Sequence, residues 1–184
     1  MKLWRGSEAP SPPHPSPGPG GVSLPIAAQH VLLASHDTAG ARAAEQAVLD
    51  GMANGGARGG ALHHLVIVPE FWRSMSGDGW RCNGSNVRDF CDYLEGQIDR
   101  EIEDHLRRVH AAALAHGLAY EAASRHGPLA DCLIEEARRI RPELVVIGSP
   151  RPKGVAGLRS RMDVDRLMRA LRVPLVVVPH PAAG

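Results

Sequence analysis

The chain lacks the long apolar segments that mark a membrane-spanning or exported protein. No run within its 184 residues approaches the ~20 consecutive apolar residues of a transmembrane helix. Its beginning also lacks the continuous apolar segment, about 7–15 residues long, of a secretory signal peptide. Three cysteines, Cys82, Cys91 and Cys132, have no CxxC spacing, which argues against a disulfide framework and a thiolate zinc site. We therefore expect a cytoplasmic protein with no membrane partner.

The chain also lacks an excess of charge of either sign. Its 21 Lys and Arg residues balance 20 Asp and Glu residues, which leaves a formal net charge of +1. The overall field therefore gives no argument for a nucleic-acid partner. With 43% apolar and 22% charged residues, the composition is typical of a globular protein, and 184 residues suit one ordinary domain.

Motifs for nucleophilic catalysis are missing as well. No GxSxG sequence is present to place a serine on a strained turn between a strand and a helix. Ser35, His36 and Asp37 are residue types found in catalytic triads, but consecutive residues cannot converge from separate segments as a triad requires. We therefore expect no catalytic residues, and only a weak ATPase activity stays open as an alternative.

Ten histidines raise the question of a metal site. His63 and His64 are adjacent, and neighbouring side chains on a strand point to opposite faces of the sheet. His105 and His110 are five residues apart, a spacing that separates helical side chains by ~140°. Neither pair converges, and no two histidines have the i, i+4 spacing that suits two ligands on one helix. The sequence therefore predicts no metal site.

Proline, serine and glycine dominate residues 7–21. Such a composition cannot bury enough apolar surface to offset the entropy lost on ordering. We interpret residues 1–27 as a disordered tail with polyproline II character and residues 28–181 as the folded domain. The alternative, a ligand for a proline-recognition domain, lacks flanking basic residues at a useful spacing.

Short apolar runs alternate with helical patterns from residue 30 onward. Expected strands are residues 31–34, 65–68, 118–123, 144–147 and 174–178, and expected helices are centred on residues 44–52, 86–117, 129–140 and 164–171. Asn86 stands at the N-cap position of the second helix and Gly117 at its end. Strands separated by helices require right-handed crossovers in a mainly parallel sheet. The predicted fold class is therefore α/β, a three-layer α/β/α sandwich.

A candidate site follows the expected strand 144–147, because ligands gather where buried parallel strands end. This strand leads into Gly148, Ser149 and a loop that carries four cations, Arg151, Lys153, Arg159 and Arg161. Two interpretations stay open. The guanidinium groups bind a nucleotide or small anion, or the loop is simply solvated.

The connection 69–85 is too long for an ordinary turn between a strand and a helix, and it contains Trp72 and Trp80. These side chains either close over a ligand or partner at the edge of the sheet, or cap the core above the second strand.

The order of elements, together with residues 144–149 (LVVIGS) and 173–178 (VPLVVV), resembles the universal stress protein family. The resemblance implies a five-stranded parallel sheet of order 3-2-1-4-5, Rossmann-like and similar to adenine nucleotide alpha hydrolases. It also implies dimerisation through the last strand, with Val176 and Val178 near the twofold axis, and in one branch an adenine nucleotide at the carboxyl edge of the sheet.

The nucleotide loop of that family reads Gly, two residues, Gly, nine residues, Gly and then Ser or Thr. Gly148 matches the first glycine, but Arg151 stands at the second, and Arg161 and Met162 stand at the final pair. The acidic residue that ends the first strand in the family aligns with His36. The cofactor-binding positions that the resemblance implies are Ala34, His36, Asp37, Gly127, Gly148, Ser149, Arg151 and Arg161.

Two functional hypotheses follow from this resemblance. The first is a homodimeric, non-catalytic stress-response or regulatory binding module with impaired ATP binding and no cofactor. The alternative is an adenine nucleotide-binding protein that holds ATP or AMP with Asp37 and loop 148–162 and hydrolyses it slowly. A relative of electron-transfer flavoproteins ranks below both, because no GxGxxG follows the first strand.

Overall fold

The computed structural model describes residues 26–36, 38–57, 59–68, 84–154 and 162–181. The predicted tail up to residue 25 and the connection with Trp72 and Trp80 lie outside these residues. Among the described residues, no helix is both long enough and apolar enough to cross a membrane.

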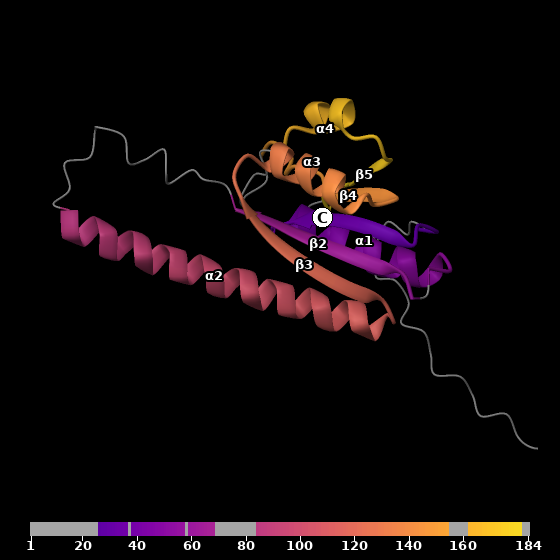
Figure 1. The fold of residues 1–184 in the computed structure, drawn as a ribbon, viewed down its shortest axis with the longest axis horizontal. Helices are drawn as coiled ribbons and strands as arrows, with labels where there is room; N and C mark the ends of the chain where they lie inside the picture. Colours follow the sequence, from indigo (N-terminus) through magenta and orange to yellow (C-terminus); the bar gives the residue numbers. More distant parts are fainter. Residues whose placement is uncertain (1–25, 37, 58, 69–83, 155–161, 182–184) are drawn as a thin grey trace, which may run out of the picture.

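Five parallel strands form one sheet in the order β3-β2-β1-β4-β5. The strands are β1 (His30–Ser35), β2 (Ala61–Val68), β3 (Ala119–His126), β4 (Leu144–Gly148) and β5 (Leu175–Val178). Figure 1 shows them as a twisted sheet between two layers of helices. The predicted three-layer sandwich and its strand order are confirmed.

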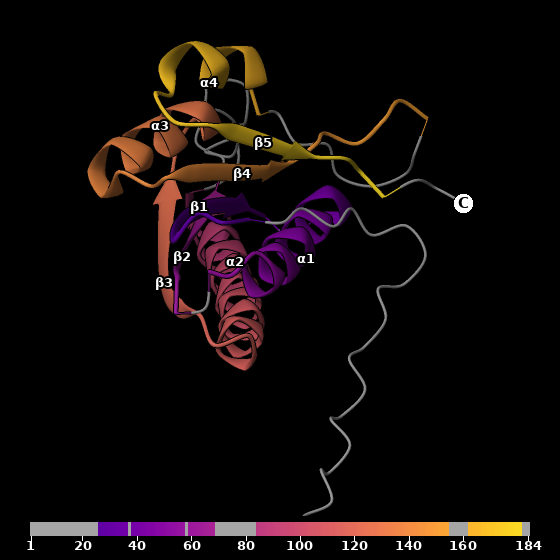
Figure 2. The same cartoon turned by 90° about the vertical axis from the view of Figure 1, so that its right-hand side faces the viewer.

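In the part of the chain that the structure describes, four helices cover the two faces of this sheet. They are α1 (Ala39–Asn54), α2 (Gly84–Ala115), α3 (Leu129–Ile140) and α4 (Val164–Ala170). Helices α1 and α2 cover one face, and α3 and α4 cover the other (Figure 2). All strands are parallel, so their carboxyl ends meet at one edge of the sheet.

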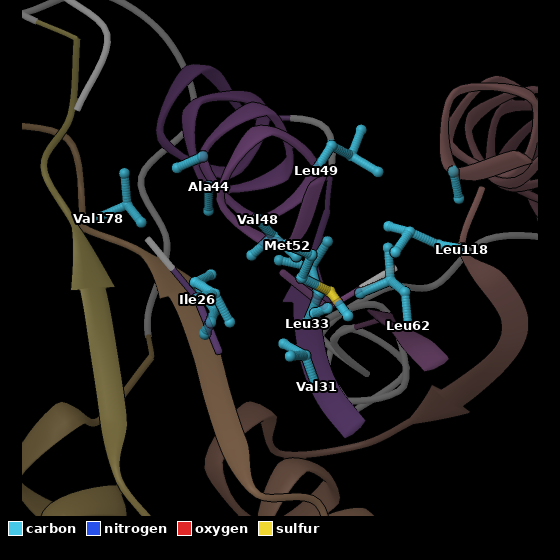
Figure 3. Packing of buried hydrophobic residues seen from close by; sticks show 14 residues of the cluster. Ile26, Val31, Leu33, Ala44, Val48, Leu49, Met52, Leu62, Leu118 and Val178 are labelled. Atoms are coloured by element: carbon cyan, nitrogen blue, oxygen red, sulfur yellow. The ribbon is translucent and has the colours of Figure 1, made fainter. Parts of the chain in front are cut away.

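Each face of the sheet carries its own apolar core, because side chains alternate along a strand. Val31 and Leu33 of β1 pack with Val48 and Met52 of α1 (Figure 3). The intervening Leu32 packs with α3 and α4 on the opposite side. Both faces of β1 are therefore buried, as its continuous apolar sequence predicts.

Several boundaries differ from the sequence-based expectation; strand β3, for example, ends at His126 rather than residue 123. Strand β2 begins at Ala61 rather than residue 65, because the two histidines in it are buried in polar clusters instead of lying in a loop. Helix α2 begins at Gly84, so the prediction that Asn86 caps it was wrong. Ile26, two residues before the expected domain start, is 5% exposed in the α1-side core.

The predicted end of α2 is correct. The helix stops at Ala115, and Gly117 follows with φ of +71°, a left-handed conformation that glycine adopts at little cost.

Candidate functional site

The carboxyl edge of the sheet brings the end of β1 next to the end of β4. Ala34 of β1 lies opposite Ile147 of β4, so His36 and Gly148 follow at the same edge. Ala34 itself is 5% exposed and packs in the core on the α3 side. The structure thus places three of the predicted residues together, although Ala34 is buried below the edge.

Helix α1 starts directly against the end of β4. A side chain at Gly148 would collide with the carbonyl oxygen of Gly40, and one at Gly40 would collide with the carbonyl oxygen of Ser149. The Ser149 hydroxyl accepts a hydrogen bond of 2.6 Å from the backbone N–H of His180. Gly148 therefore permits close packing between helix α1 and strand β4, independently of any role in ligand binding.

Arg151 is the predicted cation that lies closest in sequence to this edge. Its Nε is shielded from solvent and makes no hydrogen bond among the described residues. Because an unpaired buried donor costs free energy, an anion beside Arg151 would be stabilised. Lys153, two residues further, is exposed. Asp37 and Arg161 lie outside the described residues.

Gly127 lies on the other half of the sheet. It follows β3 with φ of +143°, and its N–H donates to the carbonyl of Val68 at 3.1 Å. Two strands separate β3 from β4, and with ~4.8 Å between neighbouring strands the two ends are ~14 Å apart. The structure therefore does not bring Gly127 together with Gly148.

A group of buried polar side chains lies between the sheet and helices α1 and α2. Ser35 ends β1, His64 lies in β2, Glu45 in α1 and His105 in α2, and none is more than 5% exposed. The Ser35 Oγ lies 2.7 Å from His64 Nε2 and 2.9 Å from His105 Nε2. Nε2 of His105 also lies 3.2 Å from Oε1 of Glu45. We call these four residues the histidine cluster.

Two further side chains fix the hydrogen positions in the histidine cluster. Arg108 Nη2 lies 2.8 Å from Nδ1 of His105, and since a guanidinium only donates, Nδ1 accepts and Nε2 carries the hydrogen. Arg108 Nη1 also lies 3.0 Å from Oε2 of Glu45. The Tyr120 hydroxyl lies 2.8 Å from Nδ1 of His64. Because this hydroxyl donates to the carbonyl of Leu106 at 3.4 Å, it accepts from Nδ1 of His64, and Nε2 of His64 carries a lone pair that faces Ser35.

Burial controls the charges of these groups. Burial, assisted by nearby His105, lowers the pKa of His64 to about 3, so this imidazole is neutral at pH 7. Burial, with a smaller effect of His105, also lowers the pKa of His36 at the sheet edge. Burial alone would raise the pKa of Glu45, but hydrogen bonding with His105 keeps that pKa below its usual value. The cluster thus combines neutral imidazole with a carboxylate.

His63 takes part in a separate cluster on the opposite face. Its Nε2 lies 2.8 Å from Oε1 of Glu136, a residue whose side chain is 1% exposed. Arg125 and Arg139 donate to the same carboxylate at 3.0 and 2.6 Å. The hydrogen bonds from Arg139, more than any other contact, lower the pKa of Glu136 to about 2. This cluster ties α3 to β2 and β3.

The sequence analysis missed the histidine cluster, although both of its statements about histidine pairs hold. His63 and His64 do face opposite sides, and His110 stacks on Tyr120 at 5.0 Å rather than joining His105. His64 instead meets His105, a residue 41 positions later on another element. One signal was available, because His64 occupies the same face of β2 as the core residue Leu62.

The structure was compared with known proteins. No family model matches the chain, and no curated protein matches its sequence. Among solved structures, a protein of the universal stress protein family from Burkholderia pseudomallei aligns with TM-score 0.57 and 22% identity. The alignment covers 85% of this chain and 98% of that one. The chain has the universal stress protein fold.

Two other solved structures of universal stress proteins contain nucleotides. One, from Arabidopsis thaliana with AMP bound, aligns with TM-score 0.58 and 14% identity over 83% of this chain and 92% of its own. The other, in complex with cAMP, aligns with TM-score 0.51 and 16% identity over 84% of this chain and 99% of its own. At these identities the comparisons establish the universal stress protein fold, which the sequence resemblance predicted.

Proposed function

We propose that this chain is a non-catalytic, homodimeric binding module of the universal stress protein type, with weakened binding of ATP. The observation that carries the proposal is the structure at the end of β4. The Gly40 carbonyl occupies the space above Gly148, and Arg151 stands where the family pattern has its second glycine. A backbone without side chains can surround a triphosphate closely, whereas an arginine at that position takes up the space.

Burial supports the absence of catalysis in this proposal. Ser35 and His64 form a hydroxyl–imidazole contact of 2.7 Å, which is the geometry of a nucleophile and its base. However, Ser35 is 2% and His64 0% exposed, so a substrate cannot reach either group in this structure. The pair is better suited to holding the core together than to reacting with a ligand.

A second candidate function is the binding of an adenine nucleotide with a single phosphate. Solved universal stress proteins of this fold hold AMP and cAMP. In this chain the shielded Nε of Arg151 supplies an unpaired donor beside the sheet edge. One phosphate needs fewer backbone donors than three, and a guanidinium can replace some of them.

Nucleotide titrations distinguish these two functions. Thermal unfolding and calorimetry of the full chain would be recorded with ATP and magnesium, AMP and cAMP at millimolar concentration. We expect no stabilisation by ATP. A ligand present at 100 times its Kd would stabilise the fold by about 2.7 kcal/mol, so even weak binding is measurable. Stabilisation by AMP alone would favour the second candidate, and strong ATP binding would contradict the first.

A matched pair of variants assigns any nucleotide binding to the sheet edge. Arg151→Ala removes the shielded guanidinium, and Lys153→Ala removes an exposed cation two residues away. We expect the first variant to abolish AMP binding and the second to leave it unchanged. Equal effects of the two variants would mean that only the general charge of the loop matters.

The proposed dimer uses β5, which lies at one edge of the sheet. Val178 is 2% exposed and Val176 packs on the same α1-side core, whereas Val177 is 37% exposed on the other side. An edge strand presents unpaired backbone N–H and C=O groups, and pairing with a second copy would satisfy them. The backbone of β5 together with Val177 would then form the contact, in place of the side chains of Val176 and Val178 that the sequence analysis placed near the twofold axis.

A further inference from the structure

We propose that Glu45, His64 and His105 form a binding site for a divalent transition-metal ion of the zinc class. The site lies between the sheet and helices α1 and α2, at the end of β1. This inference does not depend on the proposed function.

The arrangement of the ligand atoms is the first argument. One carboxylate oxygen of Glu45 and one ring nitrogen each from His64 and His105 all lie within 4.8 Å of one another. Zinc–ligand bonds of about 2.0–2.1 Å in a tetrahedral site place ligand atoms ~3.3 Å apart. The Glu45 Oε1 to His105 Nε2 distance of 3.2 Å already matches this spacing. The His64 nitrogen lies within 4.8 Å of the other two ligand atoms and must come closer to reach the same spacing.

The position of Ser35 shows that both imidazoles face one point. Its Oγ lies within 2.9 Å of Nε2 of His64 and of Nε2 of His105. The two nitrogens come from different elements, β2 and α2, so a spacing pattern within one element could not reveal them. A rotation of the Ser35 side chain would open this point to a cation, and its hydroxyl would remain close enough for a fourth, neutral contact.

An unsatisfied carboxylate oxygen is the second, independent argument. Oε1 of Glu45 is buried, and its contact of 3.2 Å with Nε2 of His105 does not have the geometry of a hydrogen bond. A buried carboxylate oxygen without a partner is costly. A cation between Glu45 and the two histidines would satisfy it. Two imidazoles and one carboxylate are a donor set that zinc binds in proteins.

Surrounding groups already orient one of the two histidines. Tyr120 contacts Nδ1 of His64, which leaves the Nε2 lone pair directed at the proposed site. Metal-binding histidines usually have their second ring nitrogen held in this way.

His105 must change its tautomer when the metal binds. Arg108 now donates to its Nδ1, so the ring hydrogen is on Nε2. Binding at Nε2 moves this hydrogen to Nδ1, and Arg108 must turn away to avoid two donors facing each other. The Arg108 side chain is 49% exposed, so it can move into solvent. The Arg108 charge also repels the cation, and removing it is expected to raise the affinity severalfold.

Cobalt titration of the full chain tests the proposal. The protein is treated with a chelator, and Co²⁺ is added while its visible d–d absorption is followed, with Zn²⁺ as competitor. We expect one Co²⁺ per chain, tetrahedral absorption, displacement by Zn²⁺ and a higher Tm with metal. Folded wild-type protein without such absorption would overturn the proposal.

Matched variants of two of the three ligands test where the metal binds. His64→Gln and Glu45→Gln keep similar size but lose a ligand, and each is expected to weaken binding more than ~100-fold. His63→Gln changes the adjacent residue on the opposite face, and His110→Gln changes an exposed histidine of α2, so both should bind as wild type. Binding that persists in both ligand variants, or that is lost in a control, would overturn the assignment.

A further variant, at a residue that is not a ligand, keeps the test valid if the ligand variants do not fold. Arg108→Leu retains all three ligands and removes the guanidinium that contacts Glu45 and His105. We expect a severalfold higher affinity for Co²⁺ and an unchanged absorption spectrum. An unchanged or lower affinity in this variant, with the fold confirmed by circular dichroism, would contradict the proposed geometry.

Discussion

At the scale of single residues, two adjacent histidines show how position decides chemistry. His63 and His64 follow each other in β2, and the alternation of the strand sends them to opposite faces. His63 contacts the carboxylate of Glu136, while His64 contacts Ser35 and Tyr120. Both are buried, but among the described residues it is His64 that belongs to a group of three possible metal ligands whose ligand atoms lie within 4.8 Å of one another. The same residue type therefore stabilises a salt-bridged cluster on one side and a candidate metal site on the other.

Glu136 gives the residue-scale prediction. Its folded-state pKa of about 2 lies below the unfolded value of ~4.3, so the folded protein binds fewer protons. The stabilisation is therefore complete above about pH 5 and is lost as the pH falls toward 2. Glu136→Gln should lower the free energy of unfolding at pH 7 by about 1–3 kcal/mol. In this variant the free energy of unfolding should also fall less steeply than in wild type as the pH is lowered from 5 toward 2.

Urea unfolding between pH 2 and 7 measures this effect. Glu135→Gln changes the exposed neighbour and should follow the wild-type curve. If the two variants have the same stability at neutral pH, the buried carboxylate does not contribute as we expect.

At the scale of secondary-structure elements, the contact between α1 and β4 determines what the sheet edge can hold. Gly40 and Gly148 let two backbones approach, and Thr38 caps α1 by accepting from the N–H of Ala41 at 3.2 Å. The sequence resemblance assigns Gly148 to a phosphate loop. The structure gives this glycine a packing role that is sufficient to explain why no side chain is present.

Two glycine substitutions test this element contact. Gly148→Ala should destabilise the protein by about 1–3 kcal/mol, because the new methyl group collides with the Gly40 carbonyl. Gly96→Ala lies inside α2, where the nearest atom is 3.9 Å away, and should stabilise it by about 0.5–1 kcal/mol. Thermal unfolding of both variants measures the two changes in stability, which should have opposite signs. A neutral Gly148→Ala would mean that α1 can shift away from β4.

At the scale of the whole molecule, the two ends of the sheet differ. Strand β3 lies at one end and is partly covered by α2, as Figures 1 and 2 show. Strand β5 lies at the other end and pairs with β4 alone among the described strands. An apolar edge strand of this kind favours association with a second copy.

Val177→Lys tests the dimer at this scale. If two copies meet along β5, their lysines would lie close together, and the repulsion should shift the protein toward monomer. Light scattering after size-exclusion chromatography of wild type and variant measures the mass. The exposed Met168 of α4 provides a control, because Met168→Lys adds the same charge on a helix instead of on the edge strand. A monomeric wild-type protein would contradict the proposed dimer.

The sequence by itself determined the fold. Apolar runs such as 144–147 and the spacing in α3 identify strands and helices, because burial on one or two faces imposes a period on the chain. Parallel strands with intervening helices then leave few arrangements. The start of β2 was not predicted, because His63 and His64 interrupt its apolar pattern.

Only the tertiary structure decided which polar residues meet. Ser35, Glu45, His64 and His105 lie on four different elements, and no local pattern relates them. Helix and strand periods fix the face on which a side chain lies, but not which side chain of another element it contacts. That choice depends on how α1 and α2 lie on the sheet. Packing of the whole core determines their positions, and a shift of a few ångströms is enough to break a hydrogen bond between two elements.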